Sequence, residues 1–236
     1  MTVNDSAEEP PDDGAAPSRR ELAVARSLDP ARARAEKRVQ RFLDAALELM
    51  QSAPDKEFTV QEVVEASGQS LRSFYQYFAG KHELLLALFE EAVRSTAEKL
   101  EKTIADEDDP LERLHRFCVE YYAVCRPSPP GRSNKPNSAG AMADFAQQLL
   151  TAHPKEASRA FIPVVTLLEE VLDNAAAAGV IRPEVHNRRT AGVILQAVMF
   201  NSFAATISGT PLDTADAAAD ELWQLVLHGI AADPAS

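Results

Sequence analysis

Apolar positions recur at helical spacing along most of the chain, and no segment shows the alternation of apolar and polar residues that is typical of a β-strand. Taking Pro, Gly and capping residues as breaks, this pattern predicts an all-α fold of about nine helices. Asp29 and Pro30 mark the expected start of the first helix, because Pro is favoured at the first helical position. The expected helices span residues 29–52, 59–66, 71–78, 81–104, 110–126, 138–152, 156–178, 188–208 and 214–230.

Two of these helices are short and are separated by a tight turn. Thr59 and Glu62 form the capping-box pattern that opens the first of them. Gly68 is suited to the left-handed conformation that ends it, and Ser70 is the expected N-cap of the second. Two short helices joined by a turn that contains Gly are typical of a helix-turn-helix.

Composition excludes some classes of protein, while the charge pattern leaves two interpretations open. Of the 236 residues 45% are hydrophobic, which is enough for a core, and no apolar run approaches the length of a membrane span. The acidic, Pro-rich N-terminus does not resemble a signal peptide, so we expect a cytoplasmic protein with no membrane partner. The net charge is −12, yet residues 19–41 hold eight bases and three acids, a balance of 8 − 3 = +5. This basic segment fits either a nucleic-acid contact at one end of the chain or an ordinary solvated helix.

A longer stretch carries a resemblance to a known family. Residues 58–91, FTVQEVVEASGQSLRSFYQYFAGKHELLLALFEE, resemble the N-terminal DNA-binding domain of TetR-family transcriptional regulators. The positions that match the family pattern in order are Thr59, Gly68, Ser70, Phe74, Tyr75, Tyr77, Phe78, Lys81, Leu84 and Leu85. Gln69 departs from it, because the family usually has an apolar residue there. The resemblance implies a homodimeric regulator of a palindromic double-stranded DNA operator, most often a repressor that a small, largely apolar ligand releases.

Helical geometry divides the side chains of the second short helix between two faces. At 100° per residue Phe74 and Phe78 share a side and are expected in the core, whereas Arg72 and Gln76 point away from it. Arg and Gln are suited to base edges, and hydroxyl groups are suited to phosphates. In the family, the positions that match Tyr75, Tyr77 and Lys81 usually contact the DNA backbone. The predicted DNA-binding residues are Thr59, Gln61, Ser70, Leu71, Arg72, Ser73, Tyr75, Gln76, Tyr77 and Lys81.

The resemblance also predicts the division of the chain and the place of a ligand. Residues 1–28 are expected to be a flexible tail, residues 29–80 the DNA-binding domain, and residues 81–236 the ligand-binding and dimerisation domain. Aromatic and Met side chains in the last of these could line an effector pocket, although such stripes are more often plain core. The candidate pocket residues are Phe117, Cys118, Tyr121, Tyr122, Met142, Phe145, Phe161 and Val165.

The helix expected over residues 188–208 has almost no polar face, and a helix that is apolar all round must be buried on every side. In the family, the last two helices pair with their copies in a dimer, and the alternative is a core within one chain. The candidate interface residues are Val193, Ala197, Phe200, Trp223 and Val226.

Catalytic and metal chemistry find little support in the sequence. It has no Gly-rich phosphate loop, no nucleophile elbow and no clustered metal ligands, so we predict no enzyme activity, no catalytic residue, no metal site and no cofactor. Cys118 and Cys125 lie seven positions apart, about 10 Å along a helix, which is too far for a disulfide between them. The alternatives are an all-α enzyme and a protein-binding module that does not bind DNA.

Overall fold

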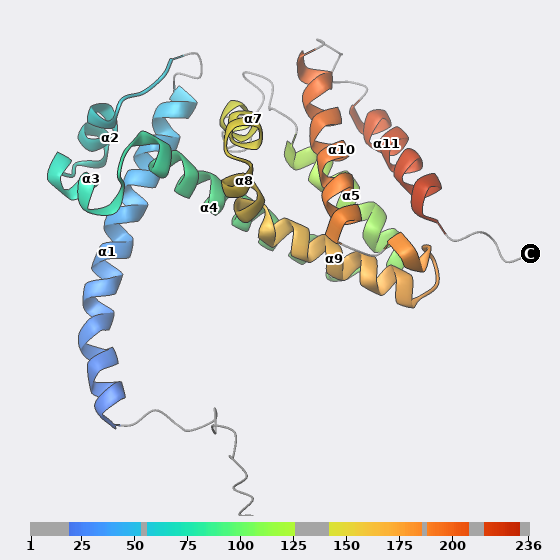
Figure 1. Cartoon of the computed structure of the whole chain (residues 1–236), viewed down its shortest axis with the longest axis horizontal. Coiled ribbons are helices and arrows are strands. Elements are labelled where there is room, and N and C mark those ends of the chain that lie inside the picture. The colour runs from blue at the N-terminus through green and yellow to red at the C-terminus, as the bar shows by residue number, and fades with distance from the viewer. Residues whose placement is uncertain (1–18, 53–55, 126–141, 186–187, 208–214, 232–236) are drawn as a thin grey trace, which may run out of the picture. The chain divides into compact units, whose positions relative to one another are not determined.

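The computed structural model describes residues 19–52, 56–125, 142–185, 188–207 and 215–231, and in these ranges the predicted all-α fold is confirmed (Figure 1). Ten α-helices are present there, together with the 3-10 helix η1 (Pro183–Val185) and an isolated bridge between Ile181 and Ala231. None of these helices has both the length and the apolar character that a membrane span needs. The α-helices are α1 (Arg19–Ser52), α2 (Val60–Ser67), α3 (Leu71–Tyr77), α4 (Lys81–Ile104), α5 (Pro110–Cys125), α7 (Ala143–Ala152), α8 (Pro154–Ala160), α9 (Ile162–Ala177), α10 (Arg188–Ile207) and α11 (Ala215–Ile230).

Two units can be distinguished, residues 1–41 and residues 42–236, and each is described by itself. The described part of the first unit belongs to α1, which begins at Arg19 and contains Pro30. The prediction that this helix starts at Asp29 is therefore wrong. Pro inside a helix removes one hydrogen bond and costs about 3 kcal/mol. Pro30 is exposed, however, and the preceding turns are rich in Arg, Leu, Ala and Glu, which are strong helix formers. The part of the predicted tail before Arg19 lies outside the described residues.

The predicted helix-turn-helix is formed by α2 and α3. Thr59 and Glu62 make the reciprocal hydrogen bonds of a capping box at the start of α2. Gly68 ends that helix with φ 63°, in the left-handed region that an L side chain rarely adopts. Ser70 caps α3 by accepting the N–H of Ser73 at 3.1 Å. The local signals in the sequence therefore predicted both ends of the turn correctly.

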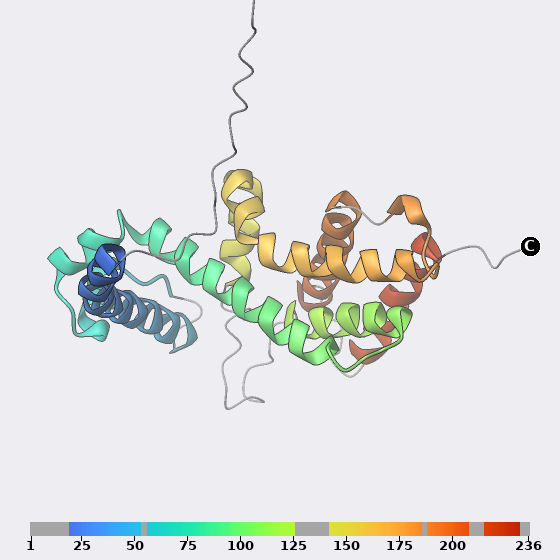
Figure 2. The same cartoon turned by 90° about the horizontal axis from the view of Figure 1, so that it is seen from below.

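The core of the larger unit lies among five of its longer helices (Figure 2). Helix α4 packs against α5 and α9, and the two figures agree in showing α4 beside α9. Helix α10 packs on α5 and α9, while α11 packs on α5 and α10. Helix α5 consequently has neighbours on most of its sides. Helices α7 and α8 contact each other, and α8 also reaches α4 and α9.

One predicted helix is divided in two. A single helix was expected over residues 156–178, but α8 ends at Ala160 and α9 begins at Ile162. Pro163 stands in the first turn of α9, where its missing N–H has no helical partner to lose, so a new helix starts there. Gly179, with φ 72°, follows the end of α9 as expected. The segment 126–138, which is rich in Pro, Gly and Ser, lies outside the described residues.

Candidate nucleic-acid interface and adjoining cavities

Helix α3 has one buried side, which is held by a cluster of three phenylalanine rings. Phe74 and Phe78 are 0% and 5% exposed. Both rings pack nearly edge-to-face against Phe42 of α1, with centroid distances of 5.4 and 6.1 Å. Such pairs are favourable beyond the apolar area that they bury. The prediction that these two residues anchor α3 in the core is confirmed.

The opposite side of α3 is open to solvent. Leu71 and Tyr75 are 43% and 57% exposed, Arg72 and Gln76 are exposed as well, and Tyr77 is half-buried. This surface therefore presents a guanidinium, an amide and phenolic hydroxyls side by side on one short helix. These are the groups that form hydrogen bonds with base edges and phosphates in nucleic-acid complexes.

The four other predicted contact residues are Thr59 and Ser70, which precede α2 and α3, Gln61 on α2 and Ser73 on α3. The side chains of Thr59 and Ser70 serve as helix caps. The Oγ atom of Ser73 is buried and has no hydrogen-bond partner within the described part of the chain. Gln61 is exposed on the first turn of α2, and its amide Nε2 donates to Oε1 of Glu65 at 3.0 Å.

Lys81 is the first residue of α4 and lies beside Phe58. Its Nζ is 4.7 Å from the centroid of the Phe58 ring and 3.4 Å from Oε2 of Glu57. The Glu57 side chain is 95% exposed, so this ion pair is weak and can be exchanged for another anion. Gly80 provides no side-chain cap for α4. A helix N-terminus with an ammonium at its first residue is suited to hold a phosphate.

A small hydrogen-bond network fixes the segment that leads into α2. One carboxylate oxygen of Glu62 accepts from Lys56 at 2.8 Å, and the other accepts from the backbone N–H of Thr59 at 2.7 Å. The hydrogen bond from Lys56, followed by those from Thr59, lowers the pKa of Glu62 to about 2. The carboxylate therefore stays ionised at neutral pH and keeps the capping box closed.

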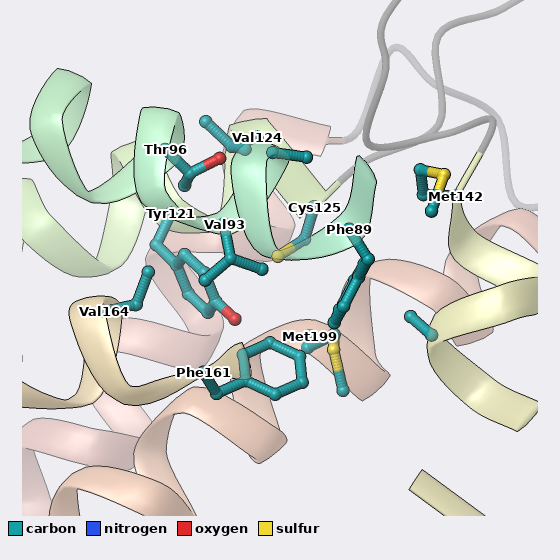
Figure 3. Close-up of a pocket in the computed structure, with 12 residues that line it drawn as sticks. Phe89, Val93, Thr96, Tyr121, Val124, Cys125, Met142, Phe161, Val164 and Met199 are labelled. Carbon is teal, nitrogen blue, oxygen red and sulfur yellow. The ribbon is translucent and has the colours of Figure 1, made fainter. Parts of the chain in front are cut away.

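Two adjoining cavities lie among the helices of the larger unit. The first has a volume of about 70 Å³ and the second about 370 Å³. Both are lined by Tyr121, Phe161 and Met199, so these three side chains separate them. The first cavity is almost entirely apolar, and the Tyr121 hydroxyl points towards the space between Phe89 and Phe161 (Figure 3). The second is more polar, because Ser158, Arg188 and Gln196 contribute to its lining.

The predicted pocket residues divide into two groups. Tyr121, Met142, Phe161 and Val165 each line at least one cavity. The other four are buried in the packing between helices and line neither of the two cavities; these are Phe117, Cys118, Tyr122 and Phe145.

Most of the lining residues were not among those predicted, and Phe89, Met199 and Arg188 are three of them. Phe89 and Met199 lie on the helices that were expected over residues 81–104 and 188–208, and no pattern in the sequence distinguishes them there from other apolar residues. Arg188 is the first residue of α10, and no pattern in the sequence connects it with α5 or α9.

Three titratable side chains on α5 stay neutral at neutral pH, namely Cys118, Tyr121 and Cys125. Burial raises the pKa of Tyr121 well above its usual value of 10, and the neighbouring Cys125 raises it further. Burial also raises the pKa of Cys118 and of Cys125 to about 12. Both cysteines are free thiols, and few thiolates form at neutral pH, so neither is a reactive nucleophile in this state.

An exposed apolar stripe follows α10. Val193 and Phe200 are 58% and 55% exposed, and Ala197 is exposed between them at helical spacing. Val226 on α11 is half-buried. The other candidate interface residue, Trp223, is only 5% exposed, because its ring stacks on His115 of α5 at a centroid distance of 4.9 Å. It therefore belongs to the core of the chain and not to the exposed stripe.

Comparison with known proteins agrees with these features. Residues 42–88 match the model of the family described as bacterial regulatory proteins, tetR family. This range contains α2, α3, Phe42 and the start of α4. No curated protein matches the chain.

Several solved structures share the fold over most of the chain. A TetR-family transcriptional regulator from Pectobacterium atrosepticum has a TM-score of 0.67 at 18% identity, covering 86% of this chain and 99% of its own. FadR from Bacillus subtilis, in complex with stearoyl-CoA, has a TM-score of 0.60 at 16% identity, covering 81% and 98%. SmeT, the repressor of the Stenotrophomonas maltophilia multidrug efflux pump SmeDEF, has a TM-score of 0.59 at 18% identity, covering 83% and 91%. At these identities the likeness is one of fold.

Proposed function

We propose that the chain is a homodimeric repressor of the TetR family of bacterial regulatory proteins, whose family model matches residues 42–88. It would bind a palindromic DNA operator, and a small, largely apolar ligand would release it from that operator. The observation that carries this proposal is the two-sided helix α3. Phe74 and Phe78 hold one side in the core, and the other side offers Arg72 and Gln76 to solvent. A short, rigidly anchored helix with polar groups on its free side is the element that enters a major groove.

The residues around α3 would divide the work of DNA binding. Arg72, Gln76 and Leu71 lie on the exposed side and would contact base edges, which carry the sequence information. Tyr75 and Tyr77 would donate hydroxyl hydrogen bonds to phosphates. Phosphate contacts fix the register of the protein on the duplex without reading the sequence. Lys81 would bind a phosphate with help from the uncapped start of α4.

A dimer would match the symmetry of a palindrome. Exposed Val193, Ala197 and Phe200 form an apolar stripe of the kind that marks an interaction surface. If the stripe pairs with its copy about a two-fold axis, each α3 addresses one half-site. Half-sites would then lie about 34–36 Å apart, one turn of DNA.

The two cavities are the proposed ligand site. The smaller one is nearly all apolar, and the larger one has Arg188 and Gln196 in its lining. This arrangement suits a molecule with an apolar body and one polar or anionic end. Ligand binding would release the DNA only if the ligand binds more tightly to an arrangement of the dimer in which the two α3 helices no longer fit successive major grooves. The protein would act in the cytoplasm, without enzymatic activity and without a cofactor.

Footprinting on the DNA upstream of the protein's own gene, followed by fluorescence anisotropy on the protected palindrome, tests the proposal. Arg72→Ala should lose about 1–3 kcal/mol on the protected sequence and should relax specificity at one or two base pairs. Lys81→Gln should weaken binding to every sequence alike and reduce the salt dependence of log K by about one unit.

The wild-type protein decides between this proposal and its alternatives. If the wild-type protein binds the protected palindrome and a scrambled duplex of the same composition with equal affinity, the proposal that it recognises a specific operator is wrong. Absence of any binding at low salt, where phosphate contacts are strongest, would support a protein-binding module instead.

A further inference from the structure

Two histidines and a glutamate meet where α4 comes close to α8. His82 is the second residue of α4, His153 lies between α7 and α8, and Glu156 stands in the first turn of α8. One possible ligand atom from each of the three lies within 4.8 Å of those of the other two. Within the described residues, no other histidine, cysteine and carboxylate side chains gather three ligand atoms so closely.

Both imidazole rings approach the same carboxylate oxygen. Nε2 of His82 is 2.8 Å from Oε2 of Glu156, and Nδ1 of His153 is 3.8 Å from it. The two rings lie side by side, with centroids 4.6 Å apart and planes inclined by 38°. An ordinary surface ion pair involves one histidine and one carboxylate. Here a ring nitrogen from each of two histidines lies near the same carboxylate oxygen.

The spacing of these atoms fits a small divalent transition ion. Zinc binds imidazole nitrogen and carboxylate oxygen at about 2.0–2.2 Å in tetrahedral geometry, so neighbouring ligand atoms lie about 3.3–3.5 Å apart. The observed separations of 2.8 and 3.8 Å bracket this value. Small rotations of the side chains are enough to bring all three atoms to bonding distance. Two imidazoles and one carboxylate also match the ligand preferences of zinc and its neighbours, and not those of calcium or magnesium.

The site is open to solvent and supported on one side. The three side chains are between 40% and 46% exposed, which leaves an ion a path of entry and a fourth position for water. The ring of Phe145 lies 5.8 Å from that of His82 and limits its movement. With zinc at Nε2, the neutral imidazole of His82 would carry its single proton on Nδ1, and any proton held at Nε2 before binding would move to Nδ1 or be released to solvent.

We propose that His82, His153 and Glu156 form a binding site for a first-row divalent transition ion, with Zn²⁺ as the best fit. The bound ion joins the first turn of α4 to the first turn of α8. This site goes beyond the proposed function, because neither DNA recognition nor an apolar ligand requires it. It also differs from the sequence-based expectation of no metal, because His82 and Glu156 are separated by 74 positions in the chain.

The test uses the full-length chain without an affinity tag, stripped of metal with a chelator and then dialysed. Titration calorimetry with Zn²⁺ should show one ion bound per chain. Co²⁺ should give the visible absorption of a tetrahedral site. Thermal unfolding should move to higher temperature with added Zn²⁺, because an ion that binds only the folded state stabilises it.

Two variants and one control locate the site. His153→Ala and Glu156→Gln change exposed side chains, and each should weaken Zn²⁺ binding at least about tenfold, the lower end of what even outer-shell changes produce. His228→Ala removes an exposed histidine on α11 and should leave the affinity unchanged. Circular dichroism of each variant verifies the fold. Lack of Zn²⁺ binding by the wild type, or equal affinity in all four proteins, would overturn the site.

Discussion

Helices α3 and α5 are both rich in aromatic rings, but they place those rings differently. In α3, Phe74 is fully buried while Tyr75, the next residue, is 57% exposed. In α5, Phe117, Tyr121 and Tyr122 are all at most 3% exposed. The first helix therefore interleaves core and surface rings, and the second keeps every one of these rings inside.

The number of neighbours explains this difference. Helix α3 packs against α2 and the Phe42 ring on one side, and its other side faces solvent. Helix α5 is contacted by α4, α9, α10 and α11. On a helix with one free side, helical periodicity separates the structural residues from those available to a partner. On a helix that is surrounded, all residues of the apolar stripe look alike, and only incomplete packing distinguishes a residue that lines a cavity.

The largest effect is expected from the buried rings of α3. Phe74→Ala should lower the free energy of unfolding by about 3–5 kcal/mol, because it removes a fully buried ring and leaves a cavity beside Phe42. Tyr75→Ala, the matched change one residue later, should cost less than about 1 kcal/mol. Urea unfolding followed by circular dichroism measures both. Similar losses for the two variants would mean that α3 has no free side.

In α5 the matched pair is Tyr121 and Tyr122. Tyr121→Phe removes a buried hydroxyl that is hydrogen-bonded with Cys125 and should cost about 0.5–1.5 kcal/mol of stability. Tyr121 lines both cavities and Tyr122 lines neither of them. The neutral fluorescent probe N-phenyl-1-naphthylamine should therefore bind Tyr121→Phe about two- to tenfold more tightly, since one polar group has left an apolar lining.

The Tyr122→Phe variant is the control for this change. Its affinity for the probe should equal that of the wild type, because its hydroxyl is buried away from both cavities. A shift of the same size in both variants would show that the probe responds to the stability of the helix and not to the cavity lining.

Local signals allowed much of the fold to be predicted. The capping box at Thr59, the left-handed Gly68 and the bounds of α4 depend on residues close together in the chain, and all three were predicted correctly. The errors involve Pro30 and Pro163. Each lies in a strongly helical pattern, in which the helix propensities of the neighbouring residues favour a continuous helix, whereas the missing N–H of proline favours a break.

The candidate sites were less predictable, because they depend on contacts between distant segments. Periodicity alone separated Phe74 from Arg72 on α3. It did not separate Tyr121 from Phe117 on α5, because the cavity is defined by Phe89 of α4 and Met199 of α10 as well. The His82 and Glu156 pair is a similar case, since its partners lie on different helices.

The smallest expected effect concerns the capping network before α2, which stabilises the region of α3 through hydrogen bonds instead of ring packing. The pKa of Glu62 is about 2 in the folded protein, below its ordinary 4.5, because Lys56 and Thr59 donate to the carboxylate. Its contribution is therefore complete above about pH 4.5 and is lost as the pH falls through 2. Glu62→Gln should give a slightly lower urea midpoint than the wild type at pH 7, and the difference should shrink towards pH 2. A difference that stays constant over this range would mean that the charge of Glu62 contributes nothing to the stability of the protein.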